Sequence, residues 1–193
     1  MSNPLNTVLI ILLLAGCAAL EPSADPTDRA AVAAETEFTF DAGMGQHKAV
    51  APSGLDYNLF RTAEDCGGRV CNHHSSRYML RAWSDELPFG QTGAQLHVSA
   101  RFNLGWALLD SAWSGGRSLP VTVIDRDVVS CKGGLNCELV ETLEVAMTRP
   151  QLETAAAQGF SVKLQGNRSS VTLDIPAPYF AGFLEALDGR AAP

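Results

Sequence analysis

The sequence predicts a mainly β protein, a single β-sandwich of immunoglobulin-like or related antiparallel topology with two short helices. Three observations lead to this prediction. Short apolar or β-branched runs, many of them alternating, are separated by turn residues through most of the chain. Hydrophobic residues make up 46% of the chain and charged residues 18%, as in a globular domain. After an N-terminal segment of different composition, about 155 residues remain, enough for one domain with its own core.

The expected strands follow one another through the domain. Two β-rich runs within residues 120–131 are expected to form a hairpin around Asp125-Arg126-Asp127, since Asp is common in turns. Gly166-Asn167 is the expected turn between the last two strands. The expected strands cover residues 36–40, 55–60, 77–83, 95–102, 107–114, 120–131, 137–148, 160–164 and 170–175.

Two stretches near the C-terminus predict helices. Thr148 can cap a helix that runs to Gln158, with Pro150 in its first turn and Gly159 at its end. The second helix is expected to cap an open side or end of the sandwich, with Phe183 in the core. Its apolar residues recur on one face, at Phe180, Phe183, Leu184 and Leu187.

The N-terminus predicts an export signal. The first twenty residues carry no charged side chain, and the apolar run from Val8 to Ala15 is far shorter than the ~20 residues that span a bilayer. Leu14-Ala15-Gly16-Cys17 resembles a bacterial lipobox. The resemblance implies cleavage before Cys17 and lipidation of this residue by fatty acids such as palmitate. Ala18 is not the aspartate that retains lipoproteins in the inner membrane of enteric bacteria, so the resemblance favours a lipid-anchored protein at the periplasmic face of the outer membrane.

The composition divides the chain into three parts. Residues 1–16 are the expected signal peptide, residues 17–36 a solvated acidic tether rich in Ala and Pro, and residues 37–190 the β-sandwich domain. The formal net charge is −7. This acidic balance argues against nucleic acid as a partner, because nucleic-acid binding needs a basic surface.

Four cysteines remain if Cys17 is lipidated. They form two local pairs around Gly-Gly sequences, and an exported protein lies in an oxidising compartment. Of the three possible connectivities, we expect Cys66–Cys71 and Cys131–Cys137. Zinc binding is the alternative, but the C-x₅-C spacing of the second pair departs from that of structural zinc sites. Neither pair has the C-x-x-C spacing of a thioredoxin-like motif.

Residues 121–187 resemble the C-terminal part of the invasion-associated locus B family of bacterial envelope proteins. The shared features are a hairpin leading to Cys131-Lys132-Gly133-Gly134 and Cys137, a helix from Leu152 to Gly159, and a closing run with Pro178, Gly182, Phe183, Ala186 and Leu187. The resemblance implies an envelope β-sandwich without established catalytic residues.

No established catalytic motif is present in the sequence. The expected function is therefore that of a non-enzymatic cell-envelope lipoprotein with a binding or structural role, no cofactor and an envelope protein as partner. The alternative is a periplasmic metal-binding protein or metal-dependent enzyme. Its candidate ligands are His73, His74 and His97, because imidazole suits copper and zinc. Solvated histidines in a loop are the simpler expectation for His73 and His74.

Overall fold

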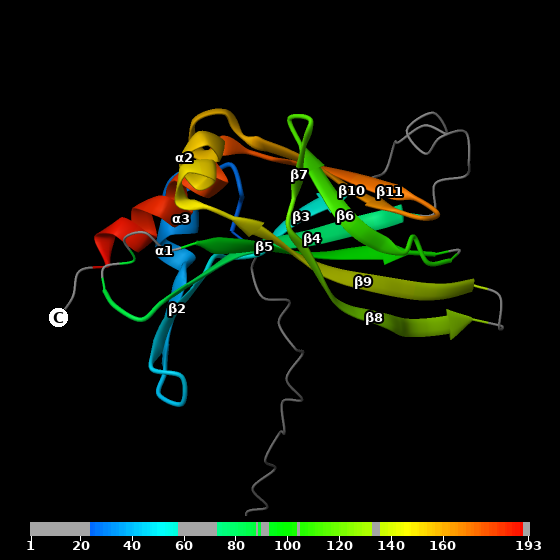
Figure 1. Ribbon diagram of the computed structural model, residues 1–193, viewed down its shortest axis with the longest axis horizontal. Coiled ribbons are helices and arrows are strands. Elements are labelled where there is room, and N and C mark those ends of the chain that lie inside the picture. Colours follow the sequence, from blue (N-terminus) through cyan, green and yellow to red (C-terminus); the bar gives the residue numbers. More distant parts are fainter. Residues whose placement is uncertain are drawn as a thin grey trace, which may run out of the picture.

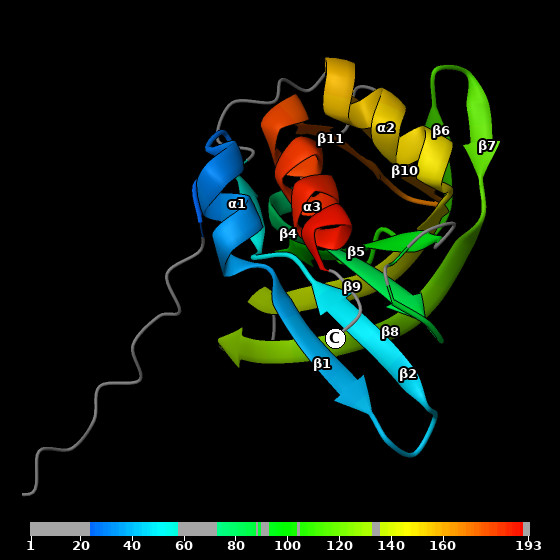
Figure 2. The same ribbon diagram turned by 90° about the vertical axis from the view of Figure 1, so that its left-hand side faces the viewer.

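The computed structural model describes residues 24–57, 73–87, 89, 93–103, 105–132 and 136–190. In this part of the chain, antiparallel strands form two sheets that lie one above the other (Figure 1). Three helices gather at one end of the two sheets and face the viewer in Figure 2. This arrangement confirms the predicted β-sandwich.

The larger sheet contains, among the described residues, β1 (Glu37–Asp41), β2 (Gln46–Val50), β3 (Gly54–Tyr57), β4 (His73–Ser84), β5 (Ala94–Phe102), β8 (Val121–Lys132) and β9 (Asn136–Met147). Its strand order is β1-β2-β4-β5-β9-β8, and β3 pairs with β4. The central strand β5 alternates strictly, so that Leu96, Val98 and Phe102 point into the core. The expected strand 55–60 corresponds to β3, although residues 58–60 lie outside the described part.

The smaller sheet contains β6 (Leu109–Ser114), β7 (Arg117–Leu119), β10 (Phe160–Gly166) and β11 (Ser170–Ile175). Its order in the described chain is β11-β10-β6-β7. The strands β10 and β11 place Val162, Leu164, Val171 and Leu173 in the core. The chain passes from the larger sheet to the smaller one after β5, returns with β8, and passes again after β9. The strands β2 and β7 were not predicted.

The hairpin predicted around Asp125-Arg126-Asp127 is wrong. These residues lie in the middle of β8, which pairs along its whole length with β9. The register shifts between Val123 and Asp125 and again between Val128 and Ser130, so the strand bends without reversing. Asp-Arg-Asp also lacks the glycine or asparagine that a tight hairpin turn favours.

The helices are α1 (Arg29–Glu35), α2 (Arg149–Gln158) and α3 (Ala177–Gly189). The bounds of α2 agree with the prediction, and Thr148 forms a capping box with Gln151. The predicted stripe of α3 is buried at each of its four positions, and Phe183 is fully enclosed. Both predicted helices are therefore confirmed, and α3 closes one end of the sandwich.

Helix α1 was not predicted, and it lies in the segment expected to be a solvated tether. Asp28 caps the helix by accepting hydrogen bonds from two backbone amides. Val32 is fully buried and Ala24 is nearly so. For residues 24–36 the prediction of a solvated chain is therefore wrong, because this segment packs against the domain.

Candidate functional site

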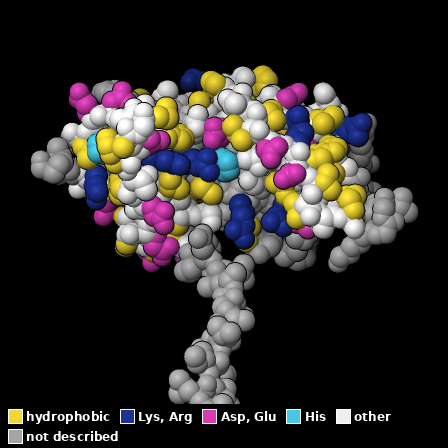
Figure 3. Space-filling view, turned by 90° about the horizontal axis from the view of Figure 1, so that it is seen from below, with side chains coloured by type: hydrophobic (Ala, Val, Ile, Leu, Met, Phe, Trp, Pro, Cys, Tyr) yellow, Lys and Arg dark blue, Asp and Glu magenta, His cyan; other side chains and the backbone are white. Residues whose placement is uncertain are grey.

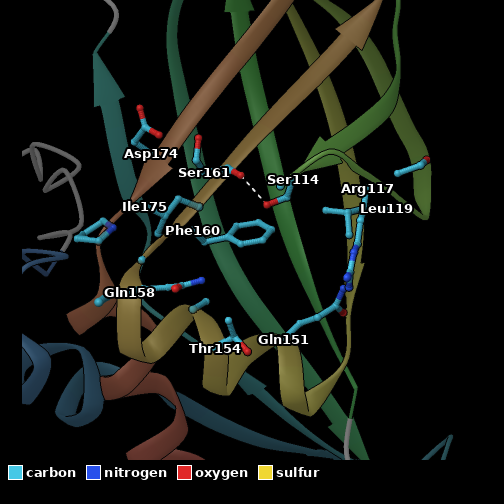
Figure 4. Close-up of a pocket in the computed structure, with 16 residues that line it drawn as sticks. Ser114, Arg117, Leu119, Gln151, Thr154, Gln158, Phe160, Ser161, Asp174 and Ile175 are labelled. Atoms are coloured by element: carbon cyan, nitrogen blue, oxygen red, sulfur yellow. Dashed lines mark hydrogen bonds between the residues drawn. The ribbon is translucent and has the colours of Figure 1, made fainter.

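The described residues form a groove of about 1000 Å³ at one end of the smaller sheet. The β6–β7 hairpin and α2 form its two walls, and the adjoining ends of β10 and β11 form its floor (Figure 4). We call it the α2–β7 groove and define it by Ser114, Arg117, Leu119, Gln151, Thr154, Gln158, Phe160, Ser161 and Ile175.

Glycines shape both walls of the groove. Gly115 and Gly116 have φ values of +55° and +76°, which a two-residue hairpin turn between β6 and β7 requires. Gly159 has a φ of +79° and turns the chain from α2 into β10. A side chain at Gly159 would also place its Cβ 3.1 Å from the carbonyl oxygen of Ile175. The close approach of α2 to the sheet therefore requires glycine here.

The groove combines an apolar floor with polar walls on which most of the side chains are uncharged. Phe160 packs edge-on against Phe180, which fixes the aromatic part of the floor. Gln151, Thr154 and Gln158 follow one another at helical spacing on the face of α2 that lines the groove. Ser114 donates a hydrogen bond of 2.7 Å to the Ser161 carbonyl and so joins the wall to the floor. Amide and hydroxyl groups over an apolar surface suit recognition of a polar ligand.

Two charged side chains stand on opposite sides of the groove. Arg117 extends from β7 toward Gln151 of α2, and Asp174 lies beyond Ser161 at the other side (Figure 4). Ser161 and Asp174 are directly paired across β10 and β11. None of these groove residues was predicted from the sequence to belong to a functional site. They come from three separate segments, and Ser, Thr and Gln carry no characteristic spacing.

The expectation that His73 is a solvated loop residue is wrong. It is the first residue of β4 and is buried, with its Nε2 2.8 Å from Ser76 Oγ and its ring 5.6 Å from that of Phe102. Residues three apart on a regular strand face opposite sides, but a register shift between His73 and Ser75 brings these two side chains together. Ser76 is fully buried, so this pair is an internal hydrogen bond of the described structure.

His97 lies on the outer face of the larger sheet, which Figure 3 shows with basic and acidic side chains side by side. Its Nδ1 is 3.5 Å from Glu144 Oε1, and Arg81 Nη1 is 3.3 Å from the same oxygen. Burial lowers the pKa of His97, and the Arg81 cation acts in the same direction. Glu144 opposes this shift.

Two of the candidate metal ligands, His73 and His97, are not brought together. His73 is opposite Phe102 and His97 is opposite Met79, six positions apart along β4, a separation of about 20 Å. The side chain of His74 lies outside the described part. No group of three or more His, Cys, Asp or Glu side chains within the described ranges is arranged to hold a metal ion.

The disulfide predicted between Cys131 and Cys137 is present, with the two sulfur atoms 2.07 Å apart. It joins paired positions of β8 and β9. Cys17, Cys66 and Cys71 lie outside the described residues, so lipidation and the other disulfide stay predictions.

None of the described helices is long and apolar enough to cross a bilayer. Comparisons with protein-family models, with curated proteins and with solved structures found no match to the chain.

Proposed function

We propose that this chain is a non-enzymatic lipoprotein of the bacterial cell envelope that binds another envelope component in the α2–β7 groove. The groove is the observation that carries the binding role, because it offers uncharged hydrogen-bonding groups over an apolar floor. The lipobox-like sequence before Cys17 supports the anchor. The disulfide between Cys131 and Cys137 fits an oxidising compartment. The resemblance to invasion-associated locus B proteins is part of the same proposal.

The anchor is tested by Cys17→Ser. Acyl chains on Cys17 provide more than the two anchoring signals that stable attachment needs. The variant should therefore lose labelling by fatty acid and leave the membrane fraction, whereas the wild type should sediment with the outer membrane. Unchanged fractionation of Cys17→Ser would contradict the anchor.

Peptide mapping without reduction should in addition find Cys66 joined to Cys71.

The groove is tested by filling it. Ser161 is an exposed groove residue, so Ser161→Trp should block the groove without disturbing the core. Lys163→Trp is the matched control, because Lys163 is exposed two residues further along β10 and does not line the groove. A photoreactive residue at Thr154 should crosslink to an envelope component in living cells, and Ser161→Trp alone should abolish the crosslink. Equal crosslinking in both variants would exclude the groove as the binding site.

A further inference from the structure

The β1–β2 hairpin carries the most exposed large hydrophobic side chains of the described structure. Phe40 is 58% exposed and Met44 72%. The hairpin extends away from the body of the sandwich (Figure 2). Exposed apolar side chains at the tip of a projecting element are typical of a surface that meets another apolar phase.

Backbone amides at the tip of the hairpin have hydrogen-bond partners within the tip, which suits contact with an apolar phase. Asp41 accepts hydrogen bonds from the backbone amides of Gly43 and Met44, at 2.9 and 3.1 Å. These two amides therefore have a partner other than water, and an unpaired amide opposes the transfer of a turn into lipid. The Phe40 ring packs against His47, with centroids 4.8 Å apart, so its orientation is held from one side.

The length of chain before the domain suggests what this tip meets. The described structure begins at Ala24, and α1 is packed on α3, so only seven residue steps separate Ala24 from Cys17. Fully extended, they reach about 25 Å. If Cys17 is lipidated, as proposed above, Ala24 cannot lie farther than this from the surface of the bilayer. The domain is then held against the membrane.

The hairpin is the apolar feature nearest to this attachment in the chain. Helix α1 leads through Thr36 directly into β1. The exposed valines of β8 lie at the opposite edge of the larger sheet, five strand spacings or about 24 Å away from β1. Beside the hairpin, Trp83 of β4 and Lys48 of β2 add an aromatic ring and a cation, with Lys48 Nζ 5.9 Å from the centre of the Trp83 ring.

We propose that Phe40 and Met44 insert into the interfacial layer of the same membrane that holds the lipid anchor. This proposal rests on the proposed anchor at Cys17. The contact is apolar, because both inserted side chains are uncharged. Its strength should therefore depend little on the anionic lipid content of the membrane.

The test uses the full lipidated protein in phosphatidylcholine vesicles whose acyl chains are brominated. Met44→Trp places a fluorophore at the tip, and Ile124→Trp is the control on the exposed edge strand β8. After subtraction of the wild-type emission, brominated lipid should quench Met44→Trp about twofold or more, since interfacial residues sit ~5–10 Å deep. Ile124→Trp should not be quenched. Phe40→Trp should behave like Met44→Trp.

Flotation of the vesicles separates the two proposals. A wild-type protein that does not float with the vesicles would refute the anchor itself. If the protein floats but the two tip variants are unquenched, the anchor stands and the hairpin insertion is wrong. Quenching of Ile124→Trp as strong as that of Met44→Trp would also overturn the hairpin as the contact, because the opposite edge of the sheet would then touch the membrane.

Discussion

One buried carboxylate connects the two sheets. Glu141 lies on the inner face of β9 and is fully enclosed. It accepts hydrogen bonds from the backbone amides of Leu108 and Leu109, at 2.9 and 2.7 Å, where β6 of the smaller sheet begins. Arg126 lies 3.3 Å from the same carboxylate and donates to the Leu109 carbonyl. Leu108 has a φ of +57°, a left-handed conformation that the surrounding bonds must hold.

Removing this carboxylate should destabilise the protein strongly. Glu141→Ala leaves two backbone donors and a guanidinium without their acceptor, which we expect to lower the free energy of unfolding by about 3–5 kcal/mol. Glu138→Ala on the same strand is the control, because its ion pair with Arg101 is partly exposed and should contribute less than ~1 kcal/mol. Denaturant unfolding measures both. Similar losses of unfolding free energy in the two variants would show that the buried hydrogen bonds of Glu141 do not stabilise the fold.

His97 should make the fold sensitive to acid. Burial lowers its pKa, so the folded protein keeps the ring neutral at a pH where the unfolded chain takes up a proton, near ~6.5. The unfolded state then binds more protons, and stability falls as the pH drops below this value. We expect His97→Gln to lose less stability than the wild type between about pH 7 and pH 5. Parallel losses in chemical denaturation would contradict this role.

At the scale of elements, the sequence predicts a helix well where the caps and the apolar stripe lie within the helical segment itself. Thr148 and Gly159 delimit α2, and α3 shows its buried stripe directly. Helix α1 has an N-cap in Asp28 but no apolar stripe, because a single fully buried side chain, that of Val32, anchors it. Its docking surface is provided by α3, about 150 residues away, where Gly182 leaves room for it.

The close packing of α1 on α3 yields a direct test. A Cβ at Gly182 would collide with the Arg29 carbonyl oxygen and lie 2.8 Å from Val32 Cβ. Gly182→Ala should therefore displace α1 and lower stability by about 1–3 kcal/mol. Gly189→Ala, at the end of the same helix, meets no atom within 4 Å and should be neutral or slightly stabilising. Denaturant midpoints compare the two, and a neutral Gly182→Ala would show that α1 can move aside freely.

Pairing partners explain the elements that sequence reasoning did not resolve. Both β-rich halves of β8 pair with β9, and Arg126 contacts Glu141 on this partner strand. The Asp125-Arg126-Asp127 sequence carries no signal for either contact. The contact between His73 and Ser76 depends on a register shift in β4. The groove is likewise assembled by tertiary structure, and its polar residues have no pattern within any one segment.

At the scale of the whole molecule, Tyr179 connects the last helix to residues in the first half of the chain. Its hydroxyl accepts from the Leu80 amide at 3.2 Å and donates to the Pro52 carbonyl at 2.8 Å. Its ring packs edge-on against Tyr78, with centroids 5.2 Å apart. The helical end of the sandwich is therefore held to the larger sheet by two hydrogen bonds and an aromatic contact between segments distant in sequence.

This connection should make the fold sensitive to alkali. Burial raises the pKa of Tyr78 to about 12 and that of Tyr179 further. An unfolded tyrosine loses its proton near ~10, so above this pH the folded state binds more protons and stability falls as the pH rises. Tyr179→Phe removes one of these groups. It should lower stability by about 1–3 kcal/mol at neutral pH, since Leu80 and Pro52 lose their partner. Between about pH 9 and pH 11, the free energy of unfolding of Tyr179→Phe should fall less than that of the wild type. Denaturant unfolding at each pH measures both. An identical alkaline loss in both proteins would show that Tyr179 does not resist ionisation in the fold.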